Sequence, residues 1–202
     1  MEGPLVSFIL PMYNDYPMTI PALFCQTHEN FEIILVHDGP VTGSDAQHLR
    51  AFSYDPRLKI YSTVKPGNDW GHRAREYGIQ FLSPESKYVV FGGVDNYYMP
   101  EFIEYLIKPM ETDPEREFLP GVVATYCDCL HNIRRWDKMS CEIRMGLIDC
   151  GNFMTRTEYA RAVGWKYRDY EADWKYIQDL QRLFCKKPGA IKKIDRTLFI
   201  HN

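Results

Sequence analysis

Four short apolar runs in the first part of the chain constrain its fold more than any other feature. They cover residues 5–10, 31–39, 57–63 and 87–93, and segments with helical apolar spacing separate them. Near-continuous apolar strands that alternate with helices are typical of a mostly parallel sheet with both faces covered. We therefore predict an α/β, Rossmann-like arrangement for residues 1–112.

The segments between these runs predict the helices that cover the sheet. Pro21 and Pro100 stand where a first helical turn tolerates proline, and Ser44 is a residue type that caps helices. The predicted helices cover residues 18–26, 44–52, 70–82 and 99–111.

The rest of the chain has a mixed pattern. Residues 121–129 are strand-like, residues 131–146 predict a loop or a hairpin, and residues 148–163 predict a strand followed by a helix. Residues 172–187 have the spacing of an amphipathic helix, and residues 190–202 predict a closing strand pair or an extended tail. We expect a single domain, whose default ligand site is a cleft between its two halves.

Charge and composition exclude several classes of protein. The 202 residues carry a net charge of −3 without a block of like charges, so bulk electrostatic binding to nucleic acid is not expected. No apolar run reaches the ~18–20 residues of a membrane-spanning helix, and the N-terminus lacks the basic region of a signal peptide. These features predict a cytoplasmic protein without a transmembrane segment.

The six cysteines fit the same location. None of them forms a Cys-x-x-Cys pair, and reduced, mostly buried thiols are the expected state in the cytoplasm. Cys127 and Cys129 would share one face of a strand, which leaves a zinc pair as the alternative, but no second pair has metal-like spacing.

Each of the four predicted strands ends in a polar segment that contains an aspartate. The segments read PMYND, HDG, KPGND and GGVDN, and they contain Asp38, Asp69 and Asp95 among other residues. Aspartate, asparagine and glycine are common turn residues, so each one alone has a structural explanation. Because the carboxyl ends of parallel strands share one edge of a sheet, we expect the four segments to meet there.

At this point the sequence resembles the family 2 glycosyltransferases, which have the GT-A fold. The resemblance rests on VSFILPMYND, TIPALFCQTHENFEIILVHDGP, NDWGHRAREYGI and VVFGGVDNYYMPEF, in that order and spacing. It covers roughly the first 110 residues well. The segments GNFMTRTEYARAVGW and ADW, and the terminal LFIHN, match more loosely. The resemblance implies a mostly parallel sheet with helices on both faces and a smaller, mixed acceptor-side region in residues 113–202.

The resemblance also implies a binding site for a nucleotide-sugar donor, most simply a UDP-sugar. Its nucleotide-binding residues map to Pro11, Tyr13 and Asn14 after the first strand and to Asp38 after the second. The family's segment near the diphosphate and sugar maps to Gly71 and Arg73, with Arg75 as the alternative to Arg73 for offsetting phosphate charge. Glu76 stands where asparagine is common in the family.

A divalent cation is implied as well. The family's Asp-x-Asp motif corresponds to Gly93, Val94 and Asp95, so the first acid is replaced by glycine and only the second remains. The resemblance adds His201, near the end of the chain, as a second ligand. An oxygen and imidazole ligand set suits Mn²⁺ or Mg²⁺. The alternative for His201 is a frayed chain end.

The catalytic base implied by the resemblance is Asp173. A carboxylate at a helix N-terminus stays ionised in the helix dipole, and transfer to a hydroxyl needs a base on the acceptor side. Glu171 is the local rival and Asp169 a weaker one. The segment CGNF, residues 150–153, resembles the acceptor-side lining of the family. Trp136 and Trp165 are candidates for sugar stacking, but core packing is the favoured explanation for each.

These features predict an inverting glycosyltransferase that moves a sugar from a nucleoside diphosphate to a hydroxyl of a glycan or another acceptor. The acceptor is either soluble or lipid-linked and reached through a partner. A sugar-nucleotide pyrophosphorylase is disfavoured, because LPMYND has no glycine, lysine or arginine to hold a triphosphate. A non-catalytic module that binds nucleotide sugars or glycans remains the alternative, and the missing acid of the metal motif is its best support.

Overall fold

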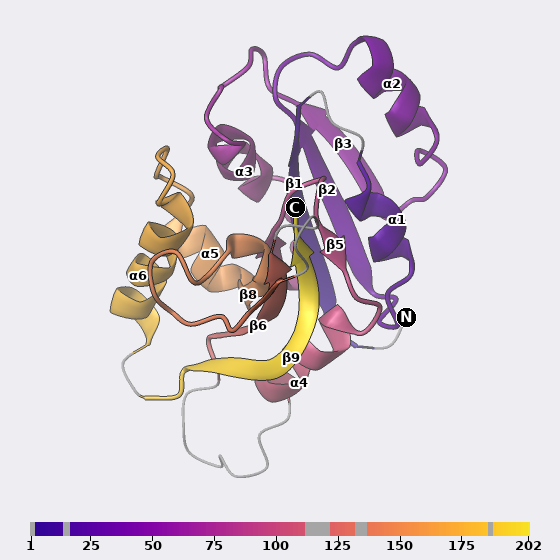
Figure 1. Ribbon diagram of the computed structural model, residues 1–202. Coiled ribbons are helices and arrows are strands. Elements are labelled where there is room, and N and C mark those ends of the chain that lie inside the picture. Colours follow the sequence, from indigo (N-terminus) through magenta and orange to yellow (C-terminus); the bar gives the residue numbers. More distant parts are fainter. Residues whose placement is uncertain (1–2, 14–16, 112–121, 132–136, 186–187) are drawn as a thin grey trace.

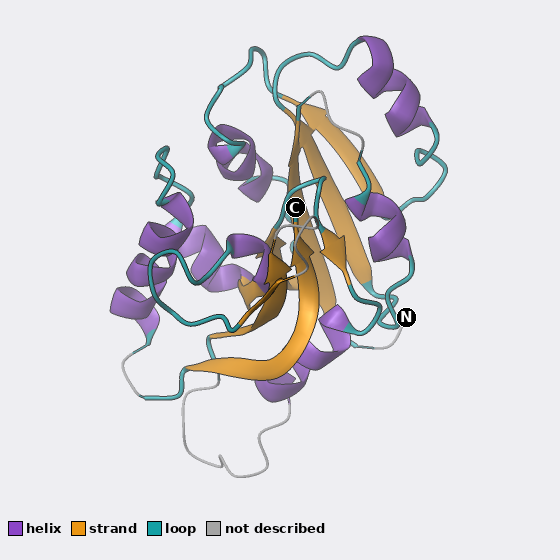
Figure 2. Ribbon diagram, viewed as in Figure 1, coloured by secondary structure: helices purple, strands orange, loops and turns teal. Residues whose placement is uncertain are grey.

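The computed structural model describes residues 3–13, 17–111, 122–131, 137–185 and 188–202. Their strands form one nine-stranded sheet in the order β3-β2-β1-β4-β8-β6-β9-β5, and β7 pairs with β6 outside that path (Figure 2). The strands are β1 (Leu5–Met12), β2 (Phe31–His37), β3 (Leu58–Ser62), β4 (Ser86–Phe91), β5 (Tyr97–Tyr98), β6 (Ala124–His131), β7 (Asp137–Met139), β8 (Phe153–Arg156) and β9 (Ile191–His201).

Helices cover both faces of the sheet. In Figure 1, α1 and α2 lie to the right of the parallel strands, whereas α3, α5 and α6 lie to the left. The helix α4 packs against β6 and β9. The bounds are α1 (Thr19–Phe24), α2 (Gly43–Arg50), α3 (His72–Ile79), α4 (Phe102–Glu111), α5 (Thr157–Val163) and α6 (Ala172–Phe184). The predicted α/β class, with a mostly parallel sheet in the first half, is confirmed.

The first strand runs further than its sequence suggested. A strand that closes at Pro11 was the expectation, but β1 continues to Met12 and pairs Pro11 with Val36 of β2. Its pairing with β4 stops earlier, at Ile9. Ile9 accepts from Gly92 N on the β4 side, and Met12 accepts from Asp38 N on the β2 side. Backbone groups of successive strand residues point alternately to the two neighbouring strands, so those of Pro11 point toward β4. Because β4 has already ended at this level, the missing N–H of Pro11 removes no hydrogen bond from the sheet.

The second half joins the same sheet with mixed polarity. The strand β8 runs antiparallel to β4, with Val89 opposite Thr155, and β6 lies on its other side. Residues 137–139 pair with β6 as β7, which is the hairpin alternative of the expectation. The end of the chain forms one long strand instead of a strand pair. This strand, β9, runs parallel to β6 and antiparallel to the short β5.

The core follows from this layering. The strands β1 and β2 are buried along nearly their whole length, because helices cover both of their faces. A group of aromatic rings joins β4 to α6. Its members are Phe91, Trp165 and Tyr176, whose ring centroids lie within 5.2 Å of one another. Among the described residues, no helix combines the length and the apolar composition that crossing a membrane requires.

Gly78 in α3 gives a test of the contact between this helix and β1. A Cβ at Gly78 would stand 2.5 Å from Cγ2 of Ile9. In an exposed helix, Gly→Ala stabilises by about 1 kcal/mol, but here we expect the added methyl group to destabilise the fold by about 1–3 kcal/mol. Urea unfolding measures the difference, with Gln80→Ala at the exposed end of the helix as the control. A more stable Gly78→Ala variant would contradict this packing.

Candidate functional site

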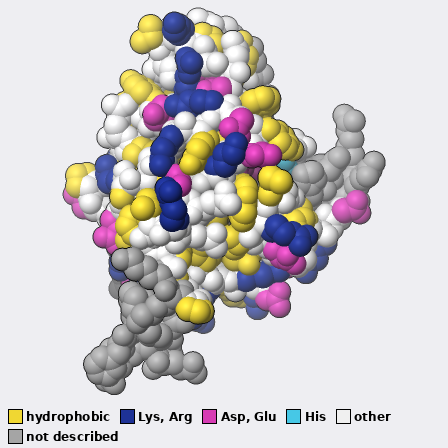
Figure 3. Space-filling view, turned by 90° about the vertical axis from the view of Figure 1, so that its left-hand side faces the viewer, with side chains coloured by type: hydrophobic (Ala, Val, Ile, Leu, Met, Phe, Trp, Pro, Cys, Tyr) yellow, Lys and Arg dark blue, Asp and Glu magenta, His cyan; other side chains and the backbone are white. Residues whose placement is uncertain are grey.

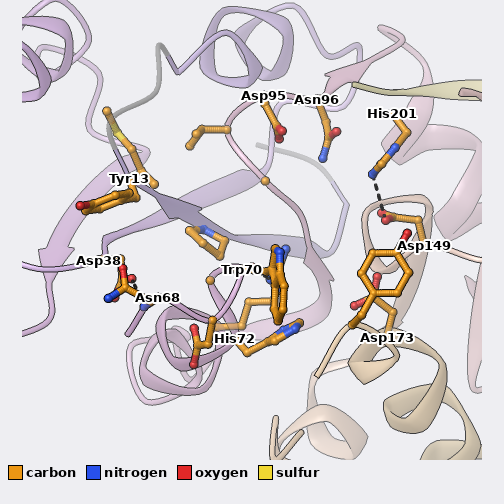
Figure 4. Close-up of a pocket in the computed structure, with 18 residues that line it drawn as sticks. Tyr13, Asp38, Asn68, Trp70, His72, Asp95, Asn96, Asp149, Asp173 and His201 are labelled. Atoms are coloured by element: carbon orange, nitrogen blue, oxygen red, sulfur yellow. Dashed lines mark hydrogen bonds and ion pairs between the residues drawn. The ribbon is translucent and has the colours of Figure 1, made fainter. Parts of the chain in front are cut away.

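One pocket of about 420 Å³ lies at the carboxyl ends of the parallel strands (Figure 4). Segments from both halves of the chain meet in it, including the last residues of β9. In Figure 1 the C-terminal end lies near the centre of the view, at the end of β9. The lining residues are Pro11, Met12, Tyr13, Asp38, Asn68, Asp69, Trp70, Gly71, His72, Arg75, Gly93, Val94, Asp95, Asn96, Asp149, Tyr170, Asp173 and His201.

Asp38 anchors one end of the pocket. Its carboxylate follows β2, is buried, and accepts hydrogen bonds from the backbone N–H of Gly67 at 2.9 Å and of Asn68 at 3.4 Å. These bonds tie the loop after β3 to the end of β2. Tyr13, which follows β1, exposes its ring on the same side (Figure 4). This end offers a buried carboxylate beside an exposed aromatic ring.

The loop after β4 carries the single acid of the expected metal motif. Thr19, at the start of α1, fixes this loop by donating its hydroxyl to the carbonyls of Gly93 and Asn96. A Cβ at Gly93 would stand 2.8 Å from Oδ1 of Asp95 and 3.2 Å from Nδ2 of Asn96. Glycine at this position therefore leaves the Asp95 carboxylate uncrowded, and Asp95 is exposed in the pocket.

The last strand brings His201 to this loop. In the ladder between β5 and β9, Tyr97 pairs with Ile200, so the next register position sets Asn96 opposite His201. The backbone N–H of Asn202 donates to Oδ1 of Asn96 at 3.4 Å. Two residues that lie more than a hundred positions apart in the sequence, Asp95 and His201, thus line the same pocket from adjacent strand ends.

Asp149 lies on the other side of His201. Its Oδ2 is 3.4 Å from Nε2 of His201, the contact drawn as a dashed line in Figure 4. The second oxygen, Oδ1, accepts from the N–H of Gly151 at 2.6 Å and caps the short 3₁₀ helix η1 (Cys150–Asn152) that precedes β8. Because β8 is antiparallel to β4, the residues just before β8 lie beside those just after β4.

Asp173, in the first turn of α6, forms the far end of the pocket. Its Oδ2 accepts from the N–H of Cys150 at 3.3 Å. Burial, and then the negative charge of Asp149, raise the pKa of Asp173, and Arg75 opposes them. An acid with a raised pKa holds a proton more tightly than an ordinary aspartate, which is the property of a general base.

The two rival acids lie outside this arrangement. Glu171 and Asp169 are exposed and both pair with Lys175, at 3.4 Å and 2.9 Å. Neither is among the residues that line the pocket. Of the three acids that precede or open α6, only Asp173 lines the pocket.

Arg75 is the cation of the pocket. Its Nη1 donates to the carbonyl of Trp70 and its Nη2 to the carbonyl of Gly92, both at 2.9 Å. Its buried Nε has no hydrogen-bond partner among the described residues. Burial alone would lower the pKa of Arg75. The acidic groups around it, Cys150 first and then Asp173 and Asp149, outweigh burial and raise that pKa.

His72 lies beneath these groups as a neutral ring. Its Nδ1 accepts from the indole N–H of Trp165 at 3.2 Å, and an indole N–H only donates. Burial, and then the charge of Arg75, lower the pKa of His72. The proton of the neutral ring is therefore on Nε2, which is buried and faces the backbone of Asp169.

Not every residue singled out in the sequence lies in this pocket. Arg73 points into a neighbouring groove, where its Nε is 3.7 Å from Asp69. Asn14 and Trp136 fall outside the described residues. Trp165 is buried against Phe91, which is the core alternative stated for it. The other predicted residues, Pro11, Tyr13, Asp38, Gly71, Gly93, Val94, Asp95, Asp173 and His201, all line the pocket.

Seven lining residues were not singled out from the sequence: Met12, Asn68, Trp70, His72, Asn96, Asp149 and Tyr170. Asn68 and Asn96 adjoin aspartates at strand ends, so the same strand-end argument reaches them. Asp149 directly precedes the segment CGNF, but only the antiparallel pairing of β8 with β4 brings it to the site. The two aromatic residues lie in loops and carry no sequence signal of their role.

Asp95 and His201 line the same pocket and offer a carboxylate oxygen and an imidazole nitrogen, donor types that would suit Mn²⁺. Among the described residues, the group with metal-like spacing is Asp149, Cys150 and Asp173, with ligand atoms within 4.8 Å of one another. Burial raises the pKa of the Cys150 thiol well above its ordinary value. A cation bound there would have to displace the proton of this thiol.

The fold and the pocket define a GT-A glycosyltransferase architecture, which the comparison with solved structures supports. Crystal structures of S. aureus TarS superpose with a TM-score of 0.74 at 12% identity, covering 99% of this chain and 37% of that chain. A mannosyltransferase, PcManGT from Pyrobaculum calidifontis, superposes with a TM-score of 0.70 at 14% identity, covering 97% of this chain and 56% of that one.

The chain belongs to glycosyl transferase family 2, whose family model matches residues 7–186. An uncharacterized glycosyltransferase of Rickettsia bellii is 32% identical over 109 residues, which are 52% of this chain and 15% of that protein. A further uncharacterized glycosyltransferase, from Haemophilus influenzae, is 29% identical over 107 residues, or 52% and 41%. The matched segment thus spans less than half of the length of these curated relatives.

Proposed function

We propose that this chain transfers a sugar from a UDP-sugar to an acceptor hydroxyl with inversion of configuration. The observation that carries the proposal is the meeting of three carboxylates in one pocket: Asp38 at one end, Asp95 at the middle and Asp173 at the other end (Figure 4). Among the solved neighbours, TarS is described in complex with UDP and with UDP-GlcNAc, and PcManGT with GDP-Man and Mn²⁺. These bound ligands of the neighbours support a nucleoside-diphosphate sugar as the donor.

The proposed roles follow the order of groups along the pocket. Asp38 accepts hydrogen bonds from the base or the ribose, and Tyr13 lies against the base. Pro11, Gly71, Gly93 and Val94 form the backbone surface on which the donor rests. Arg75, in place of Arg73, offsets the charge of the diphosphate. Residues 1–112 thus hold the donor, and residues 113–202 supply the base and the acceptor side.

In the proposed reaction Asp173 removes the proton from the acceptor hydroxyl. The oxygen attacks the anomeric carbon, and the bond from that carbon to the diphosphate oxygen breaks with its electron pair on the leaving group. Arg75 stabilises the negative charge that develops there. When bound at Asp95 and His201, Mn²⁺ or Mg²⁺ would supply further stabilisation of the same charge. The proton ends on Asp173.

Metal dependence tests the proposal through Asp95. We expect transfer from UDP-sugars to stop in EDTA and to return with Mn²⁺ or Mg²⁺. Removing one ligand and its charge, as in Asp95→Ala, should lower kcat/KM by about 10–100-fold and raise the concentration of Mn²⁺ needed for half-maximal activity. The measurement is the rate of UDP release from the donor at increasing concentrations of Mn²⁺. The exposed Asp137, outside the pocket, provides the control variant Asp137→Ala.

The alternative function is a non-catalytic module that binds nucleotide sugars. Glycine at position 93, in place of the first acid of the motif, is the feature that favours it. An assay of UDP binding and of turnover distinguishes the two functions. The turnover assay uses a panel of UDP-, GDP- and dTDP-sugars with Mn²⁺ present. A chain that binds UDP but neither hydrolyses nor transfers any of these sugars is a binding module.

A further inference from the structure

Trp70 exposes a large apolar ring at the mouth of the pocket. Its side chain lines the pocket although 70% of the residue is accessible to water. Its backbone φ is +54°, a conformation that bulky residues rarely adopt. Exposing an indole forgoes the free energy of burial, and a strained backbone persists only where the surroundings impose it. These two costs at one residue point to a ligand contact.

The surroundings of Trp70 hold its backbone in place. The carbonyl of Trp70 accepts from Nη1 of Arg75 at 2.9 Å. The next residue, Gly71, also has a positive φ, and a Cβ there would stand 2.4 Å from Cβ of Pro11. On the other side, the Asp69 carboxylate accepts from the backbone N–H of Arg73. The groups that form the pocket thus also fix the backbone from which the indole projects.

The indole lies between the two ends of the pocket. In Figure 4 it stands between Tyr13, Asp38 and Asn68 on one side and Asp149 and Asp173 on the other. A donor bound along the floor, from Asp38 to Arg75, leaves the exposed face of the indole to a ligand that enters from solvent. Tyr170, which precedes α6 and is 88% exposed, is a second aromatic ring of the lining.

The charge of the pocket restricts that ligand. Five carboxylates line it, whereas Arg75 is its one arginine or lysine among the described residues. The acids nearest the acceptor end are Asp149 and Asp173 (Figure 4). An anionic acceptor would meet these two carboxylates there, with Arg75 alone among the arginines and lysines of the described lining to offset them, and like charges in a partly buried site repel strongly.

The neighbouring groove does not correct this balance. It is lined by Lys65, Arg73 and Arg168 among other residues, but Arg168 pairs with Glu76 and Asp69, and Arg73 lies 3.7 Å from Asp69. Figure 3, which views the left-hand side of Figure 1, shows basic and acidic side chains interspersed on this face. A surface of paired charges is not suited to an extended anionic polymer.

We propose that Trp70 is a stacking platform for a sugar ring of the acceptor, and that this acceptor is an uncharged glycan. The face of an aromatic ring is electron-rich and attracts partly positive hydrogens, such as the C–H groups on one face of a pyranose. A rigid indole loses little conformational entropy when it binds. The inference rests on the proposed function, because it names the acceptor class of that site.

Fluorine NMR with 5-fluorotryptophan tests the inference. The Trp70 resonance is assigned from the Trp70→Phe variant, and the protein is saturated with UDP and Mn²⁺. The probes are the methyl β-glycosides of glucose, galactose and mannose, with methyl β-glucuronide as the charged match. We expect at least one neutral glycoside to shift the Trp70 resonance, and the glucuronide to bind at least about fivefold more weakly. No shift with any neutral glycoside, or equal binding of the glucuronide, overturns the inference.

Variants separate the acceptor from the donor. Trp70→Ala should weaken binding of the neutral glycoside at least about tenfold, Trp70→Phe should retain part of it, and the affinity for UDP should stay within about twofold. Tyr54→Ala, which removes an aromatic ring that is 78% exposed outside the pocket, is the matched control. A parallel loss of UDP affinity in Trp70→Ala would assign the ring to the donor and overturn the inference.

The same experiment keeps the two proposals distinguishable. Binding of UDP is measured first, by calorimetry, on the wild-type protein. If UDP binds and donor turnover occurs while no glycoside reaches Trp70, the acceptor inference fails and the proposed function stands. If UDP does not bind, the proposed function itself fails.

Discussion

Replacing Asp173 by asparagine should lower kcat by about 10²–10⁴-fold, the usual contribution of a general base, while UDP affinity stays nearly unchanged. Asparagine keeps an oxygen that accepts from the N–H of Cys150, so the local structure should survive. The measurements are steady-state kinetics for kcat and calorimetry for UDP. Glu171→Gln provides the matched control, because Glu171 is the local rival and lies outside the pocket lining.

The same variant should be more stable than the wild type. Burial, the largest cause, raises the pKa of Asp173 in the folded state above its value in the unfolded chain. The folded state then binds more protons, so stability falls as pH rises from the unfolded to the folded pKa. At neutral pH the charge of Asp173 is therefore destabilising, and Asp173→Asn removes it. A gain of about 1 kcal/mol would raise Tm by about 2–4 °C in a domain of this size.

Two results would contradict this role for Asp173. The first is a kcat within about threefold of wild type in Asp173→Asn, because the base would then lie elsewhere. The second is a comparable loss of kcat in Glu171→Gln. A variant that loses activity and Tm together would instead have lost its fold, and the difference is visible in the same melting curves.

Replacing Arg75 by glutamine should lower kcat/KM by about 10²–10³-fold, as loss of a group that stabilises developing charge does. Arg75 is the one arginine or lysine in the described lining of the pocket, and it lowers the pKa of Asp173 against the effects of burial and Asp149. Without it that pKa rises further. Since Asp173 acts as a base when ionised, the acidic limb of the pH–rate profile should move to higher pH.

The pH profile separates an electrostatic role from a structural one. A merely structural role of Arg75 would lower kcat/KM without moving the acidic limb. Arg73→Gln tests the competing assignment from the sequence, in which Arg73 offsets the phosphate charge. Its exposed guanidinium lies in the neighbouring groove, so we expect an effect below about threefold on kcat/KM. A larger loss in Arg73→Gln than in Arg75→Gln would contradict the assignment to Arg75.

The sequence was sufficient for the donor half of the fold. A buried β-rich run such as residues 31–37 can be recognised from its local sequence. Because a parallel sheet places every strand end on one edge, the residues that follow such runs, Asp38 and Asp95 among them, can be assigned to that edge. The family resemblance added His201 and Asp173, which no local pattern connects to that edge. Their meeting in one pocket depends on β9 and α6, whose positions the sequence did not specify.

The residues that sequence reasoning missed have a common physical cause. Asp149 reaches the site only because β8 runs antiparallel to β4, a pairing set by the packing of the second half. Trp70 is positioned by a loop in which its own φ is positive and its carbonyl accepts from Arg75. Bulky residues rarely adopt such a conformation, so the local sequence does not predict it. The choice between Arg73 and Arg75 depended on the rotation of α3 about its axis, which its weakly amphipathic sequence left open.

The continuity of the sheet restricts how substrates enter. The strand β4 lies in residues 1–112 and β8 in residues 113–202, yet they pair directly, with Tyr88 opposite Arg156 and Val90 opposite Met154. A hinge that separated the two halves would have to break this ladder. In the proposed reaction, substrates would therefore enter and products leave through movement of loop segments over a continuous sheet.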